Sequence, residues 1–101
     1  MAIFKNVAGQ KLAVFAWNTT TDTEVTGDAA NIVAQISKDG AATATTSDAN
    51  PTELDAADAP GVYLFDLSQS ETHADLVVLF AQASTSNVTV EPVISYTVAV
   101  C

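Results

Sequence analysis

The stretch Thr52–Ser84, TELDAADAPGVYLFDLSQSETHADLVVLFAQAS, carries the pattern that decides the fold. Its first apolar run is Val62–Leu67. Side chains alternate between the two faces of an extended strand, so Tyr63, Phe65 and Leu67 share one face. This alternation predicts a sheet that buries a core on one side, and the run itself contains no catalytic group.

The segments around this run complete the local prediction. A Pro-Gly pair at 60–61 is typical of a turn and predicts that the strand begins after it. Ser68 and Glu71 have the spacing of a capping box, which predicts a helix of one or two turns over 69–74. The second apolar run, Leu76–Ala83, is predicted to be the next strand.

The rest of the chain is rich in Thr, Val and Ala and favours short strands. Asp39-Gly40 predicts a hairpin turn, and Pro92 predicts an edge or a bulge because proline cannot donate to a sheet ladder. Strands are expected at Ile3–Val7, Lys11–Trp17, Thr23–Thr26, Asn31–Lys38 and Ala41–Thr46, and in one or two pieces over Val88–Val100. We therefore expect one all-β domain over residues 1–101, an antiparallel immunoglobulin-like β-sandwich of about seven or eight strands, with a small closed barrel as the alternative.

Charge limits the classes of partner. Of the 101 residues, 12 are Asp or Glu and only three are basic, which gives a net charge of -9. Such a chain repels a phosphate backbone and an anionic membrane surface, so we expect neither nucleic acid nor membrane as a partner. No apolar run approaches the ~20 residues that span a bilayer, and the first residues do not have the pattern of a secretory signal.

Candidate catalytic and metal-binding groups are few. The only histidine, His73, falls in the predicted short helix, and the only cysteine, Cys101, is the last residue, where it can make no internal disulfide. Asp55 and Asp58 are carboxylates in a predicted loop, but the loop lacks the alternating oxygen ligands of an EF-hand. We therefore expect no enzyme activity, no cofactor and no metal site, and a hydrolase requires His73 to lie beside a serine in a cleft.

Aromatic and apolar residues near strand ends are the remaining candidates for binding. Phe15 and Trp17 share one face of a strand whose two faces are both apolar, which fits either the core or a contact between subunits. The apolar last strand is an aggregation risk unless it is paired internally or covered by a neighbouring chain. The candidate interface residues are Ile3, Phe4, Phe15, Trp17, Tyr96, Val98 and Val100, and the segments Ile3–Val7 and Val98–Cys101 are candidates for ordering by a neighbour.

The run NPTELDAADAPGVYLFDLSQSETHADLVVLF, together with the preceding VTGDAANI and ISKDG, resembles a module that recurs in proteins of tailed bacteriophages. The likeness spans roughly Lys11 to Tyr96. Such modules look like small β-sandwich virion components, and the resemblance implies no catalytic residues. A free-standing chain of this size fits a head decoration, or cement, protein better than a fibre domain.

The resemblance therefore implies a non-enzymatic virion structural protein on the capsid surface, made in the cytoplasm of a bacterial host. Its expected partners are the major capsid protein, other virion proteins and further copies of itself, for which a trimer is a natural arrangement. The alternative is a neck, tail or fibre module that recognises another virion protein or the host surface.

Overall fold

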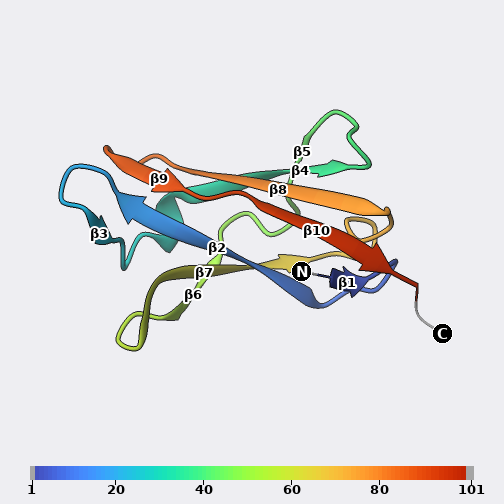
Figure 1. Cartoon of the computed structure of the whole chain (residues 1–101), viewed down its shortest axis with the longest axis horizontal. Coiled ribbons are helices and arrows are strands. Elements are labelled where there is room, and N and C mark those ends of the chain that lie inside the picture. Colours follow the sequence, from blue (N-terminus) through green and yellow to red (C-terminus); the bar gives the residue numbers. More distant parts are fainter. Residues whose placement is uncertain (1, 100–101) are drawn as a thin grey trace.

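The computed structural model of the chain describes residues 2–99, and strands dominate it (Figure 1). The strands are β1 (Ala2–Phe4), β2 (Gln10–Asn18), β3 (Thr23–Glu24), β4 (Ile32–Lys38), β5 (Ala44–Thr45), β6 (Thr52–Asp55), β7 (Ala59–Leu67), β8 (Leu76–Ala83), β9 (Val88–Val90) and β10 (Val93–Val98), with one 3-10 turn, η1 (Ala29–Asn31). The prediction of an all-β chain is confirmed.

The strands form two sheets that lie against each other. The first sheet has the order β1-β10-β8-β4-β5, and the second has the order β3-β2-β7-β6, with β9 also paired to β2. The chain passes from the second sheet to the first between β9 and β10, and Pro92 lies in this crossover, where no ladder hydrogen bond is required of it. Figure 1 shows the two layers, with β8 and β10 in one and β2 and β7 in the other.

The core lies between the sheets and follows the period of two in each long strand. Tyr63, Phe65 and Leu67 of β7 are buried, as predicted. On β4, the alternate residues Ile32, Ala34 and Ile36 point inward and are also buried. Burial of apolar area at about 25 cal/mol per Å² is the main force that holds the layers together.

Two predicted local features are wrong, and the first is the turn at the Pro-Gly pair. Residues 60–61 lie inside β7, and the turn comes earlier, where Asp55 Oδ1 accepts hydrogen bonds from the backbone N–H groups of Ala57 and Asp58, both at 3.1 Å. An aspartate side chain that caps its own turn in this way replaces the Pro-Gly signal. The result is a tight hairpin between β6 and β7, with Asp55 opposite Ala59.

The second wrong prediction is the helix over 69–74, where the structure has only turns. The capping-box hydrogen bonds do form, but Thr72 is fully buried and its Oγ1 donates to the Val7 carbonyl at 3.0 Å. The Val7 N–H donates back to the same hydroxyl at 2.9 Å. This inward anchor, only four residues before β8, ends the helical path after one turn.

The sheets are also not wholly antiparallel. β1 pairs with β10 in parallel, with Ile3 opposite Thr97, while the other pairs of strands are antiparallel. The Asp39-Gly40 turn does join β4 to β5 as an antiparallel pair, as predicted, although β5 has only two residues.

Candidate protein-contact surface

The last strand, β10, places three of its four large apolar residues outward, and the fourth, Val93, packs against the core. Ser95 is fully buried, whereas Ile94, Tyr96 and Val98 are 60%, 65% and 48% exposed. This orientation reverses the usual arrangement of a strand on a core, in which the apolar residues of the alternation point inward. The clean alternation of this strand therefore marks an exposed apolar row.

The neighbouring strands extend this row into a surface. Residues that lie opposite each other on adjacent strands share a face of the sheet. Ile94 lies opposite Val78 of β8, Tyr96 lies between Leu76 and Ala2, and Val98 lies opposite Phe4 of β1. On the far side of β8, Phe80 lies opposite Gln35, and Val33 lies opposite Gln82. We call this surface the outer face of the first sheet; its exposed large apolar residues are Phe4, Val33, Phe80, Ile94, Tyr96 and Val98.

Six of the seven large apolar residues that the described chain exposes lie on the outer face. The seventh, Leu54, belongs to β6 in the other sheet. A soluble domain scatters such residues singly, so their concentration on one face is typical of a contact surface.

The outer face carries no charged side chain. The only charged residue in the five strands of the first sheet is Lys38, which lies opposite the buried Val77 and is therefore in register with the inner face. Its amine turns to the Ser70 carbonyl at 3.0 Å. The strands of the second sheet, by contrast, carry Lys11, Glu24, Glu53, Asp55 and Asp66.

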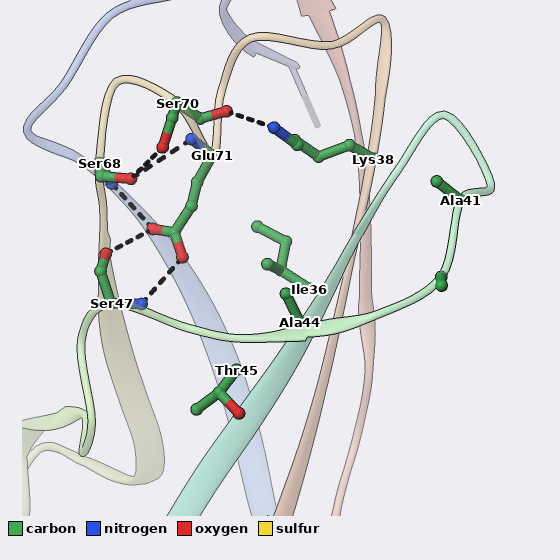
Figure 2. Close-up of a pocket in the computed structure, with 10 residues that line it drawn as sticks. Ile36, Lys38, Ala41, Ala44, Thr45, Ser47, Ser68, Ser70 and Glu71 are labelled. Carbon is green, nitrogen blue, oxygen red and sulfur yellow. Dashed lines mark hydrogen bonds between the residues drawn. The ribbon is translucent and has the colours of Figure 1, made fainter.

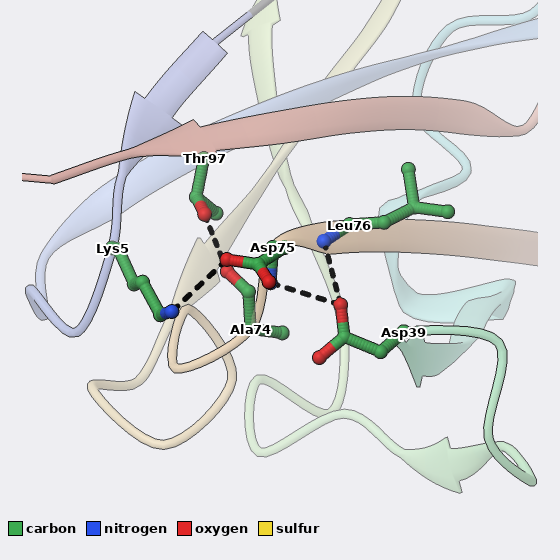
Figure 3. Close-up of polar contacts among 6 residues, drawn as sticks. All are labelled: Lys5, Asp39, Ala74, Asp75, Leu76 and Thr97. Atoms are coloured by element: carbon green, nitrogen blue, oxygen red, sulfur yellow. Dashed lines mark hydrogen bonds and ion pairs between the residues drawn. The ribbon is translucent and has the colours of Figure 1, made fainter.

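Charges appear at one end of the first sheet, outside the strands (Figure 3). Lys5 and Asp75 form an ion pair with 2.9 Å between Nζ and Oδ1. Asp39 Oδ1 accepts hydrogen bonds from the backbone N–H groups of Asp75 at 2.9 Å and Leu76 at 3.0 Å, and the Thr97 hydroxyl donates to the Ala74 carbonyl. These contacts join the turn before β8 to the residues that follow β1 and β4 and to the end of β10. Together they form a polar rim.

The predicted interface residues do not form one cluster. Phe4, Tyr96 and Val98 lie on the outer face, and Ile3 points the other way and is 8% exposed. Val100 lies outside the described residues. The sequence argument missed Ile94, Phe80 and Val33, because alternation by itself does not say which half of a strand faces the core.

Phe15 and Trp17 lie on the far side of the molecule, on the outward side of β2. Both are half-buried, and their ring centroids are 5.8 Å apart with the planes tilted by 33°. Their neighbours Leu12, Val14 and Ala16 fill the core instead. The aromatic pair is thus a second surface feature rather than part of the core.

A pocket of about 270 Å³, with a mostly apolar lining, lies between the β4–β5 hairpin and the turn after β7 (Figure 2). Glu71 is buried at its wall and accepts hydrogen bonds from the Ser47 N–H at 3.0 Å, the Ser47 hydroxyl at 2.9 Å and the Ser68 N–H at 2.9 Å. Burial raises the pKa of this carboxyl, but the hydrogen bonds from Ser68 and Ser47 outweigh burial and lower the pKa below its ordinary value. A carboxylate held ionised by three donors ties loops together and is a poor proton donor.

His73 is exposed in the turn before β8 and lines one open pocket together with Ser68 and Ser70. The two serine hydroxyl oxygens bond each other at 3.2 Å. Asp55 caps its own hairpin, and Cys101 lies outside the described residues. Within residues 2–99 no three His, Cys, Asp or Glu side chains gather as a metal site, and no helix there is long and apolar enough to cross a membrane.

Tyr63 links the core to a buried acidic loop. Its hydroxyl donates to the Val25 carbonyl at 2.8 Å and accepts from the Asp28 N–H at 3.2 Å. Asp28 Oδ1 accepts from Asn31 Nδ2 at 2.8 Å and from the Thr85 hydroxyl at 2.7 Å. These hydrogen bonds hold the segment between β3 and η1 against the two sheets.

Comparisons with models of protein families, with curated proteins and with solved structures found no match for this chain.

Proposed function

We propose that this chain is a non-enzymatic structural protein that acts through protein–protein contact, with an immunoglobulin-like sandwich as its scaffold. The observation that supports this most is the outer face of the first sheet, which exposes Ile94, Tyr96 and Phe80 and carries no charged side chain. Large apolar side chains in a contiguous uncharged surface are the composition of an interface centre.

The specific form of the proposal is a decoration protein of a phage capsid, located on the virion surface. It rests on the sequence resemblance of Asn50–Phe80, and of the segments before it, to virion modules, not on the geometry. In this role the protein bridges neighbouring shell subunits, the major capsid protein and further copies of itself among them. Many weak contacts then add up, since multivalent attachment multiplies affinity without new kinds of contact.

Two measurements test this proposal. Particles assembled without the protein should lose resistance to heat and to chaotropes, and adding the purified protein back should restore it. Tyr96→Asp should fail to restore resistance, while Leu54→Asp, at another exposed apolar position outside the outer face, should restore it fully. Unchanged resistance without the protein contradicts the cement role, and locating the protein within a particle at low resolution separates head, neck and tail.

The alternative is a neck, tail or fibre module that binds another virion protein or the host surface. The half-buried Phe15–Trp17 pair favours it, because a tilted aromatic pair outside the core can receive a ligand. Binding to a glycan array or to host envelopes that disappears in Trp17→Ala and persists in Tyr96→Asp would support this module. Binding that is insensitive to Trp17→Ala would remove the pair from consideration.

A further inference from the structure

The outer face of the first sheet is apolar and uncharged although the chain is strongly acidic, which is typical of a surface that a partner covers. We propose that the occupant is the same face of a second copy, so that two chains form a face-to-face dimer about a two-fold axis. This inference rests on the proposed function and names the surface that brings copies together.

The charge distribution favours a second copy. Two chains that each carry -9 repel each other wherever their acidic surfaces meet. The strands of the second sheet carry four acidic residues, of which Glu24, Asp55 and Asp66 are exposed, whereas those of the first sheet carry no acidic residue. The outer face is therefore the surface on which two identical acidic chains can approach with the least repulsion. A basic partner would find no carboxylate there to pair with.

The arrangement of side chains on the outer face is self-complementary. Its centre is the cross-strand pair of Ile94 and Val78, on the adjacent strands β10 and β8. A two-fold axis along the line between these strands lays β10 of one copy over β8 of the other, so that apolar rows meet apolar rows. The polar residues Gln35 and Thr45 lie toward the β5 edge, and Gln82 lies near the end of β8, so polar side chains border the apolar rows, as in known interfaces.

The size of the outer face sets the strength of the contact. At ~4.8 Å between strands and ~3.3 Å per residue, the strands of the first sheet have a footprint of roughly 400 Å². A stable dimer needs about 800 Å² of accessible surface per partner. Side chains that protrude from the sheet add accessible area to this flat footprint, but the total remains small. We therefore expect a weak, concentration-dependent dimer that becomes populated where many copies are held close together.

Sedimentation equilibrium from about 1 µM to 1 mM tests the dimer, with a reductant present so that Cys101 cannot link chains. We expect a monomer–dimer equilibrium that Ile94→Asp and Tyr96→Asp each weaken at least tenfold. Leu54→Asp is the matched control, because it adds the same charge at an exposed apolar position of the other sheet, and it should leave the equilibrium unchanged. Circular dichroism confirms that each variant is folded.

A second measurement needs no variant. Amide chemical shifts of the unaltered protein, recorded across the same dilution series, should move at Phe80, Ile94 and Tyr96 and stay constant at Leu54. A protein that remains monomeric at about 1 mM, a trimer, or a dimer that Leu54→Asp weakens as much as Ile94→Asp would overturn the inference. A monomer that still protects particles, and whose Tyr96→Asp variant does not, would leave the proposed function intact while the dimer fails.

Discussion

The Glu71 carboxylate accepts two hydrogen bonds from Ser47, one from its backbone N–H at 3.0 Å and one from its hydroxyl at 2.9 Å. The two residues are 24 positions apart, so this contact fastens the segment after β5 to the turn after β7. Ser68 adds its own N–H from within the turn. One buried side chain thereby closes two loops over one end of the core.

Replacing this carboxylate should cost stability. Glu71→Gln exchanges one acceptor oxygen for an NH₂ group that must face a donor, and hydrogen bonds to charged groups are worth about 1.5–3 kcal/mol each. We expect the free energy of unfolding in urea to fall by about 2 kcal/mol. Glu91→Gln, at an exposed position between β9 and β10, is the control and should change it by less than about 0.5 kcal/mol. Equal stability of both variants would show that Glu71 is not a structural anchor.

The lowered pKa of Glu71 predicts how the free energy of unfolding changes at acidic pH. The pKa of Glu71 in the folded chain lies below its ordinary value of 4.5. The unfolded chain therefore binds the proton first, and the stabilisation is complete above that ordinary pKa. It is lost as the pH falls through the lower folded pKa. Urea titrations of the unaltered protein and Glu71→Gln should differ at pH 7 and converge in acid; a constant difference down to the acid limit would contradict the ionised, hydrogen-bonded carboxylate.

Tyr63 should show the opposite pH dependence. Burial, more than any other cause, raises the pKa of its hydroxyl above the ordinary value of 10.0. Its stabilising effect is then complete below pH 10 and is lost as the pH rises through the raised pKa. Tyr63→Phe leaves the Val25 carbonyl and the Asp28 N–H without their partner, which should cost about 1–3 kcal/mol at pH 7 and remove part of the alkaline destabilisation. Tyr96→Phe, on the exposed outer face, is the control and should leave the free energy of unfolding at pH 7 nearly unchanged.

The strands were predictable where the alternation of apolar side chains extends over a whole element. Leu76–Ala83 begins and ends as predicted, and Tyr63, Phe65 and Leu67 fill the core as their spacing indicates. In the structure these strands bury one face, and an alternation of period two in the sequence reflects the burial of one face. The sequence was therefore sufficient for the all-β class and for much of the core.

The outer face could not be predicted in the same way. Ile94, Tyr96 and Val98 alternate with polar residues as a core strand does, and only the structure shows that Ser95 takes the buried side. The prediction of a helix in the turn after β7 was wrong for a related reason. Its capping box formed locally, but the long-range bonds between Thr72 and Val7 overrode helix propagation. Local patterns do not record contacts between residues that are far apart in the chain.

Gly61 marks a close approach between the two central strands of the second sheet. Its φ is +89°, and a Cβ atom there would lie 2.7 Å from Phe15 Cε1 and 3.1 Å from the Ala16 carbonyl oxygen. Gly61→Ala should therefore lose about 1–3 kcal/mol from backbone strain and more from the contact. Gly40→Ala is the matched control, since its φ is +76° and no atom lies within 4 Å of the added methyl group.

The difference between these two alanine variants isolates the steric contact from the backbone strain. Phe15→Ala should reduce that difference in the double variant, because the ring is the atom group nearest the new methyl. Thermal or urea unfolding measures the unaltered protein, the three single variants and the double variant of Gly61→Ala with Phe15→Ala. Equal losses for Gly61→Ala and Gly40→Ala would mean that Phe15 moves aside freely, and that the glycine is needed only for its backbone angle.

Gln10 closes the open edge of the first sheet, and its removal should expose that edge. Its side-chain amide accepts from the Phe4 N–H at 2.7 Å and donates to the Phe4 carbonyl at 2.8 Å, the pair of bonds that a neighbouring strand would make. The same NH₂ group also donates to the Val7 carbonyl at 2.9 Å. Gln10→Ala should lower the free energy of unfolding by about 1 kcal/mol, because water replaces these partly exposed bonds, and should increase aggregation through the freed edge of β1.

Gln10→Glu separates the two effects of this edge closure. Its carboxylate still accepts from Phe4 N–H but faces the Phe4 and Val7 carbonyls without a donor, so stability should fall at least as far as in Gln10→Ala. Its added charge at the edge should nevertheless suppress aggregation, as edge charges do in natural sheets. Urea unfolding and light scattering at about 1 mM measure the two quantities, with Gln69→Ala, at an exposed position in the turn after β7 and away from the outer face, as the control. If Gln10→Ala scatters no more light than Gln69→Ala, then β1 does not present an edge that needs closing, and the Gln10 amide serves only to position the segment between β1 and β2.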